Sequence, residues 1–537
     1  MSLNIYKKYF IAFSLIVIYA VIFYENLDQI IVGNISIYPI HAISLVESGA
    51  LFFTIESNGQ IETFLPNFHT FLYTIFLSFA FSIANFVSSS ALHLDVEGIN
   101  LVIKLANLLI ITLTGFVFSS FFKNKQKIDK LLIVMMYLLL PLSIYGILSA
   151  DMYQILTPLF LLLGYKFLQK KSYAYTILFF GLALLSKETM GLVGMSLVLL
   201  GEIFIKKSLS FWRGFFLGLF SLILGIIGYL LLCKVLNLPA DFIISATKYH
   251  IDGRGFDSTN ILLFIREFFI ASLLAFIIFL PFTKIKDSFR HPNNILAFTI
   301  FLSVCCINVY FGYINIRYLS ALMPIILVLL LTTRSLEIDF ERRAAIFGVI
   351  SAAFIIYVYK DMGIYIRDLE ISLHLLNDLK LWILIFCCLA FVYLPQKFYL
   401  NKLTVYATFS ATTFLYISQT SYQINFQFAL PNPGPALSLI SREKPLISDL
   451  PSSELYFRDN VAHSISTSNH YFALGNTLST TTQNETNLRI DNIITSSSFS
   501  KGYSVFTREN SDTFNYFERV ETCNERFADY YAVFTCN

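Results

Sequence analysis

The sequence predicts an all-α polytopic membrane protein with a small α+β or β-rich domain at its C-terminus. Three observations indicate this fold class. Of the 537 residues, 56% are hydrophobic and only 14% are charged, a balance more apolar than that of soluble globular proteins. The apolar residues gather in repeated runs that are long enough to cross a bilayer as helices. Residues 419–537 are instead rich in Ser, Thr, Asn and aromatic side chains and contain no long apolar run.

About thirteen runs have the length of a membrane span, since a helix needs roughly 20 apolar residues to cross the hydrocarbon core. They lie near residues 9–24, 101–122, 131–150, 152–168, 173–187, 188–205, 211–234, 261–283, 294–315, 319–333, 344–360, 380–395 and 403–418. The first run lacks a following cleavage site and is expected to remain as an anchor. The runs at 173–187 and 188–205 are short, and kinked or re-entrant helices would suit them. Residues 1–418 are therefore expected to form a transmembrane module.

The positions of lysine and arginine predict the orientation of this module, because basic residues stay on the cytoplasmic side. The basic clusters lie at 7–8, 123–130, 170–171, 206–213, 284–290, 334–343 and 397–402, whereas residues 25–100 contain no lysine or arginine. A cytoplasmic N-terminus places every cluster inside and residues 25–100 outside, as a first extracytoplasmic loop. This scheme requires the apolar stretch Phe68–Val87 to lie along the outer interface of the cytoplasmic membrane instead of crossing it.

The same alternation places residues 419–537 outside, as a periplasmic or extracellular C-terminal domain. A linker rich in proline at 431–435 separates this domain from the last span. Cys523 and Cys536 are expected to form a disulfide, because the outer compartment is oxidising. Three short segments have the composition of strands: Glu454–Phe457, Tyr503–Thr507 and Tyr530–Thr535.

Ionisable residues at the outer face are the main candidates for function, since charge near a membrane is costly. The first loop carries seven acids and three histidines, which suit a general base or a divalent metal, although nothing in the sequence requires a cofactor. The alternative is that these acids and histidines only form the polar surface of a solvated loop. Asp151 lies between two apolar runs, where it either caps the next helix or belongs to a site. The net charge of +3 is too small to indicate a nucleic-acid partner.

Cations at the outer face suit the recognition of phosphate. Lys187 interrupts a long apolar stretch and is followed by Glu188. Either the lysine binds a phosphate, or it snorkels to water and pairs with Glu188. Arg254, in the loop 241–257, and Arg317 are the other outward cations, and Arg317 would also suit an interfacial anchor. The sequence has no Walker A, GxGxxG, CxxC or HExxH motif, which argues against an ATPase, a dinucleotide enzyme and a zinc protease.

Several of these residues occur in stretches that resemble the GT-C superfamily of polyprenyl-phosphate-sugar-dependent glycosyltransferases, which includes protein mannosyltransferases and lipid A aminoarabinose transferases. The segment from Asp151 to Gly191 carries an acid before a span, a basic inner turn and the stretch Gly181-Leu182-Ala183-Leu184-Leu185-Ser186-Lys187. Ala42–Gly49 is similar to the first-loop helix of that family, and Leu65–His69, followed by aromatic residues, is similar to its second interfacial helix. Arg317-Tyr318-Leu319 is similar to a stretch in its later spans. The resemblance covers roughly residues 10–330.

This resemblance implies transfer of a sugar from a polyprenyl-phosphate donor to a cell-envelope glycan, lipid or protein. Lys187, Arg254 and Arg317 would bind the donor phosphate, and the substrate would contact Asn34, His69 and Glu188. The family usually has an acid at the place of Asn34, and an amide cannot act as a base. Either Asp28, Glu62 or Asp151 acts as the base in its place, or the site is inactive. A glycan polymerase or ligase, which should carry arginine-rich outer loops, and a lipid-linked-sugar transporter, which should carry polar residues inside its spans, remain as alternatives.

Overall fold

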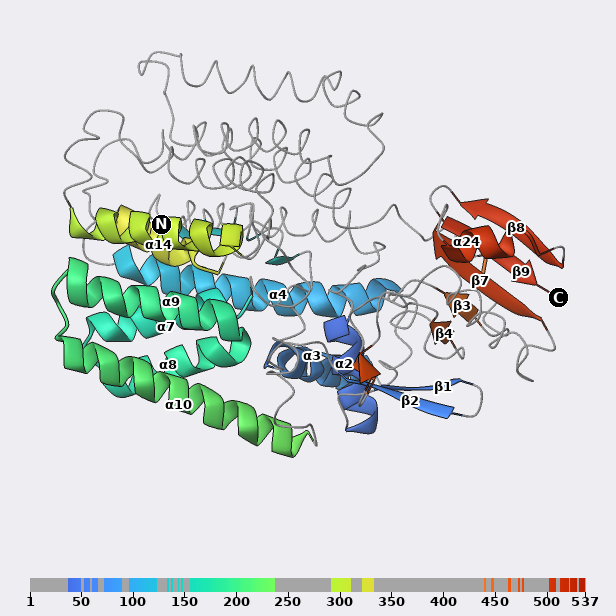
Figure 1. The fold of residues 1–537 in the computed structure, drawn as a ribbon, viewed down its shortest axis with the longest axis horizontal. Coiled ribbons are helices and arrows are strands. Elements are labelled where there is room, and N and C mark those ends of the chain that lie inside the picture. The colour runs from blue at the N-terminus through green and yellow to red at the C-terminus, as the bar shows by residue number, and fades with distance from the viewer. Residues whose placement is uncertain are drawn as a thin grey trace, which may run out of the picture.

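The computed structural model describes a helical bundle, helices and a hairpin from the first loop, and strands from the C-terminal region (Figure 1). The described residues are 37–49, 53–57, 60–65, 72–88, 96–122, 155–236, 291–310, 321–332, 439–440, 446–448, 462–464, 472–473, 476–477, 502–508, 512–520, 522–528 and 531–536, with isolated positions between 133 and 147.

The bundle is formed by helices that run side by side (Figure 1). They are α4 (Val96–Ser119), α7 (Thr157–Gln169), α8 (Tyr173–Ser186), α9 (Glu188–Leu200), α10 (Phe211–Val235), α14 (Pro292–Tyr310) and α16 (Met323–Leu331). The 3₁₀ turn η3 (Ser120–Phe122) extends α4, and the π-helix η5 (Gly201–Ile205) extends α9. Each helix falls on a run that the sequence predicts to be apolar and helical.

Among the described residues, three helices are long and apolar enough to span a membrane: Gly98–Phe122, Glu188–Ile205 and Phe211–Val235. They correspond to the predicted runs at 101–122, 188–205 and 211–234. The runs at 9–24, 261–283, 344–360, 380–395 and 403–418 lie outside the described residues, and only scattered positions of 131–150 are described. The chain is therefore a helical membrane protein, while the count of thirteen spans stays a prediction.

Close approach of the helices depends on glycines at their contacts, as is usual for helices in lipid. Helix α8 lies between α7 and α10. On its first side, a Cβ on Gly164 would lie 2.4 Å from the ring of Phe180. On its second side, a Cβ on Gly225 would lie 3.0 Å from the Cβ of Leu184. Phe180 and Leu184 are both buried, so the absence of a side chain on each glycine lets a large residue of α8 fill the contact.

One end of the bundle, here called the basic end, holds the lysines of the turns after α7 and after η5. Lys166 Nζ near the end of α7 donates to Ser120 Oγ at 2.7 Å, and Lys206 Nζ donates to Tyr165 OH at 3.1 Å. These bonds bring together the C-terminal ends of α4, α7 and η5. The turns that carry Lys170 with Lys171 and Lys206 with Lys207 therefore lie at the same end, as the alternation of spans predicts.

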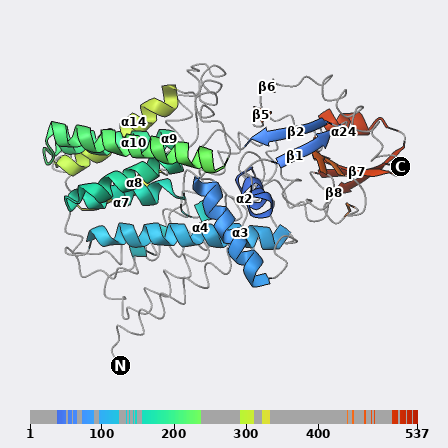
Figure 2. The same ribbon diagram turned by 90° about the horizontal axis from the view of Figure 1, so that it is seen from below.

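The opposite end, here called the loop end, holds the helices of the first loop, α2 (Ile37–Ser48) and α3 (Leu72–Ser88). Buried residues at the ends of α8 and α10, including Leu185 and Cys233, pack with Leu45 of α2 and Leu72 of α3. Helix α3 is seen nearly end-on in Figure 1 and lies across the bundle in Figure 2. This direction agrees with the prediction that Phe68–Val87 does not cross the membrane.

A hairpin of β1 (Phe53–Ser57) and β2 (Gln60–Leu65) connects α2 with α3. Strand β2 also pairs with β5 (Phe472–Ala473) of the C-terminal region, with Phe64 opposite Ala473. Strand β6 (Asn476–Thr477) completes this antiparallel sheet, whose order is β1-β2-β5-β6. The first loop and the C-terminal region thus share one sheet, a pairing that the sequence did not predict.

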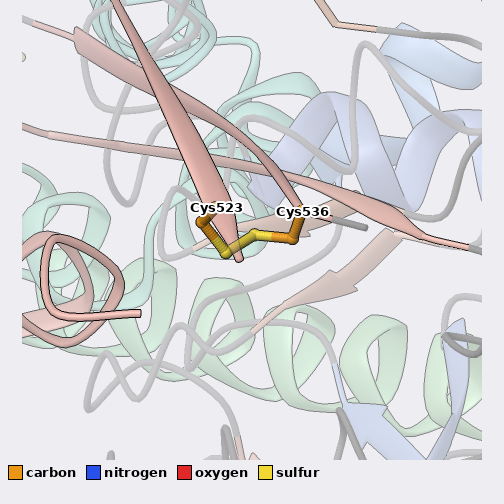
Figure 3. Close-up of a disulfide and its surroundings, with 2 residues drawn as sticks. All are labelled: Cys523 and Cys536. Carbon is orange, nitrogen blue, oxygen red and sulfur yellow. A yellow bond between two sulfur atoms is a disulfide. The ribbon is translucent and has the colours of Figure 1, made fainter. Parts of the chain in front are cut away.

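A second sheet has the order β4-β3-β7-β9-β8 and lies beyond the loop end (Figures 1 and 2). Its strands are β4 (Ala462–Ser464), β3 (Leu446–Ser448), β7 (Tyr503–Arg508), β9 (Tyr531–Cys536) and β8 (Cys523–Ala528). Helix α24 (Asp512–Phe517) packs Phe514 and Phe517 on Phe534. Strands β7 and β9 match two predicted strands, and Glu454–Phe457 lies outside the described residues. The predicted disulfide joins Cys523 to Cys536 (Figure 3).

Candidate functional site

Lys187 forms the whole connection between α8 and α9 at the loop end. Its backbone is extended, with φ −156° and ψ 107°, and separates Ser186, the last residue of α8, from Glu188, the first residue of α9. Its N–H donates to the Ala183 carbonyl at 3.1 Å, and its carbonyl accepts from Gly191 N–H at 2.7 Å. Both helices are therefore fixed to the residue that carries the charge.

The tight turn depends on Gly191. A Cβ at this position would lie 2.4 Å from the carbonyl oxygen of Ala183, which real contacts do not tolerate. Only glycine lets the first turn of α9 approach the backbone of α8 this closely. The segment Gly181–Gly191 thus contains the last part of the apolar helix α8, a connection of one residue, and the first turn of α9. The runs at 173–187 and 188–205, which were predicted to be kinked or re-entrant, form the helices α8 and α9, which meet at Lys187.

The ammonium group of Lys187 is buried and paired. The side chain is 2% exposed, and Nζ donates to Glu188 Oε1 at 2.8 Å, while Glu188 is 23% exposed. Pairing with Glu188 was one of the two interpretations of the sequence, but the lysine does not extend to water as a snorkelling residue would. A desolvated cation attracts a second anion more strongly than a solvated one does. The pair can therefore receive a phosphate through Lys187 and a hydroxyl through the more exposed Glu188.

Two hydroxyl groups bring the start of α7 to the same turn. Ser186 Oγ donates to the Ala183 carbonyl at 2.8 Å and lies 2.9 Å from Thr157 Oγ1. Because the single proton of Ser186 serves Ala183, Thr157 is the donor in the second bond. Thr157 follows Asp151 by six residues. The chain that leaves Asp151 therefore reaches the Lys187 turn, although Asp151 itself lies outside the described residues.

A buried polar face on α4 also lies toward the loop end. Asn100, Lys104 and Asn107 follow each other at helical spacing and are at most 2% exposed. Tyr73 of α3 donates from its hydroxyl to Asn107 Oδ1 at 2.9 Å, and Asn107 Nδ2 donates to the Ile147 carbonyl at 3.4 Å. This face was not predicted from the sequence. The spacing of the three residues was the signal that would have identified one polar face.

Of the nine candidate site residues, the structure brings Lys187 and Glu188 together. Glu62 lies on β2, opposite Ile55 of β1. The other candidates lie outside the described residues: Asp28, Asn34, His69, Asp151, Arg254 and Arg317. Within the part of the chain that is described, no three His, Cys, Asp or Glu side chains are grouped so that they could hold a metal ion. The described site is thus a buried ion pair at the end of a helical bundle.

Comparison with solved structures identifies this fold, a helical bundle with first-loop helices and a C-terminal sheet at the same end. The structure is similar to that of ArnT from Cupriavidus metallidurans bound to undecaprenyl phosphate, with a TM-score of 0.61 and 14% sequence identity over 99% of this chain and 98% of that chain. It is also similar to the apo state of the same ArnT, with a TM-score of 0.57 and 13% identity over 98% of each chain.

Neither a family model nor a curated protein matches this sequence. At such low identity, the similarity to ArnT establishes the fold. The activity has to be argued from the site.

Proposed function

We propose that this protein is a membrane glycosyltransferase that takes a sugar from a polyprenyl-phosphate donor and transfers it to a cell-envelope glycan, lipid or protein. One observation carries the proposal: the fold is shared, along nearly the whole chain, with a protein that binds undecaprenyl phosphate. Fold alone does not fix function. The buried Lys187–Glu188 pair at the loop end adds a cation that can bind the donor phosphate and a carboxylate that can contact the substrate.

The reaction is a displacement at the anomeric carbon of the sugar. The bond from that carbon to an acceptor oxygen forms, and the bond to the phosphate oxygen breaks, so the polyprenyl phosphate leaves with the bonding electrons. A carboxylate removes the proton of the acceptor hydroxyl. Candidates for this base are Asp151, Asp28 and Glu62. Lys187 stabilises the charge that grows on the leaving phosphate, assisted by Arg254 and Arg317.

The proposal includes an orientation in the cytoplasmic membrane. The basic end faces the cytoplasm together with the N-terminus, and the loop end faces the periplasm or the extracellular space. The position of Lys166, Lys170, Lys171, Lys206 and Lys207 at the end away from the first-loop helices supports this orientation. The disulfide at Cys523 supports an oxidising compartment for residues 419–537. In this position, that domain helps to select the acceptor.

A transporter of lipid-linked sugars is the second candidate. The polar face of α4 favours it, because buried polar residues within spans line the substrate paths of transporters. The two functions differ in chemistry, since a transported lipid keeps its sugar whereas a transferase product carries the sugar on an acceptor. A transfer assay therefore separates them.

The test uses membranes that contain the protein, with radiolabelled polyprenyl-phosphate sugars as donors. Transfer of label to an acceptor is expected for the wild type, and Lys187→Ala is expected to lower it by about a hundredfold, the size of a lost transition-state donor. Asp151→Asn is compared in parallel. Lys170→Ala is the matched control, because Lys170 is exposed at the basic end and should not change transfer. Equal transfer by the wild type, Lys187→Ala and Asp151→Asn would remove the proposed site.

A further inference from the structure

The polar face of α4 contains a second buried lysine at the loop end. Lys104 is 2% exposed, and its neighbours on the same face, Asn100 and Asn107, are fully buried. Helix α4 belongs to the span Gly98–Phe122, whose far end is bound to the basic end through Ser120. Lys104 lies six residues from Gly98, which corresponds to about 9 Å along the helix axis. The ammonium group therefore lies on the half of the bundle that holds the Lys187 turn.

The surroundings of this face are rigid. Tyr73 bonds Asn107 from α3, and its ring contacts Tyr38 of α2 edge to face, with centroids 5.9 Å apart. Asn107 also donates to the Ile147 carbonyl, so the amide has partners on two sides. Helices α2 and α3 of the first loop are thus fixed against the face that carries Lys104. These contacts hold the amide of Asn107, which lies about one helical turn from Lys104, in place on the polar face.

Placing lysine inside a span costs several kcal/mol, so such residues usually serve a function. The cost of removing water from the ammonium group has already been met in the folded protein. An anion that binds the ammonium group gains a charge-assisted hydrogen bond. A lipid carrier brings such an anion to the loop end of the bundle, because its tail lies in the hydrocarbon core and its phosphate lies at the membrane surface.

We propose that Lys104 binds the phosphate of the lipid carrier, on the face where Tyr73 and Asn107 join α3 to α4. The inference rests on the proposed function and deepens it. The carrier phosphate would then contact two buried lysines, Lys187 from the turn between α8 and α9 and Lys104 from α4. Tyr73 and Asn107 act as positioning residues, because they hold the first-loop helices against this face.

The test compares binding of undecaprenyl phosphate with binding of undecaprenol, which has the same tail and no phosphate, by the purified full-length protein in detergent. The ratio of the two affinities measures recognition of the phosphate alone. Lys104→Met and Lys104→Gln are each expected to lower this ratio about tenfold or more, the size of one lost hydrogen bond to a charged group. Lys104→Arg, which keeps the charge, is expected to retain most of the preference.

Thr114→Val is the matched control, since Thr114 is buried on the same helix, about 15 Å further along. Its hydroxyl donates to the Ile110 carbonyl of its own helix, and the variant should keep the wild-type ratio. An unchanged ratio in folded Lys104→Met and Lys104→Gln would overturn the inference. Failure of both variants to fold would also overturn it, by assigning Lys104 to the stability of the bundle. A wild type that binds undecaprenol as tightly as undecaprenyl phosphate would instead contradict the proposed function.

Discussion

Single residues decide how closely the helices of this bundle meet. Gly191 allows α9 to start against the backbone of α8, and that contact buries Lys187 at the turn. The motif Gly181–Lys187 predicted an outward cation from sequence alone, because charge alternation fixes the end of each span. The burial of the cation could not be predicted, since it depends on side chains from helices far away in the sequence.

Gly191→Ala is expected to destabilise the protein by about 1–3 kcal/mol, the usual cost of overpacking a contact. The added methyl group would meet the Ala183 carbonyl at 2.4 Å, which is backbone and cannot rotate away. Thermal unfolding in detergent measures the loss. Gly218→Ala is the control, because its Cβ would meet only Leu199 Cδ1 at an ordinary 3.4 Å. Equal melting temperatures for the two variants would show that the turn tolerates a wider separation of α8 and α9.

At the scale of elements, the π-helix η5 ends α9 around a buried carboxylate. Glu202 is 5% exposed and accepts from Lys206 Nζ at 2.7 Å and from the Ser208 hydroxyl. Its backbone carbonyl accepts from Ser208 N–H at 2.9 Å. Burial acts to lower the pKa of Lys206, but Tyr165 and Glu202 outweigh it and raise the pKa above its usual value. Because its pKa is raised in the folded protein, Lys206 contributes its full stabilisation below the ordinary pKa of lysine. This stabilisation is lost only as the pH rises through the raised pKa, so it is constant near neutrality.

Glu202→Gln is expected to lower stability by about 2 kcal/mol, because Lys206 loses the carboxylate beside it while remaining partly buried. Thermal unfolding at neutral pH reports the change. Lys207→Asn removes an exposed neighbouring charge, and asparagine tolerates the φ of 52° found there, so this variant should melt like the wild type. If Glu202→Gln also melts like the wild type, the ion pair at the end of α9 adds no stability.

Among the elements, α3 is the one whose direction agrees best with the prediction from charge counting. Without any lysine or arginine in residues 25–100, a crossing at Phe68–Val87 would have turned the next basic cluster outward. The β1–β2 hairpin was missed although its signal is present, because Asn58-Gly59 stands between the two strands and Asn-Gly is typical of a two-residue hairpin turn. The pairing of β2 with β5 carried no such signal, since β5 comes from the other end of the chain. Pairing between such distant segments is set by the folded protein and not by local sequence.

At the scale of the whole molecule, the pairing of β2 with β5 connects the first loop to the C-terminal region. Phe64→Cys with Ala473→Cys is expected to form a disulfide, since these residues are direct partners across antiparallel strands. Peptide mass spectrometry identifies the product. The pair Ile55→Cys with Ala473→Cys is the control, because Ile55 lies on β1 and pairs with Glu62. Cross-linking of the control pair alone would place β5 on a different strand.

The orientation of the molecule decides whether a donor from the outer leaflet can reach Lys187. Glu47, exposed at the end of α2, lies with the loop end, and Lys207 is exposed at the basic end. A membrane-impermeant thiol reagent applied to intact cells is expected to label Glu47→Cys and to leave Lys207→Cys unlabelled until the cells are opened. The parent protein gives the background from its own cysteines. Labelling of Lys207→Cys in intact cells would reverse the orientation and put the buried lysines at the cytoplasmic face. A transferase acting on the outer leaflet could not then use them.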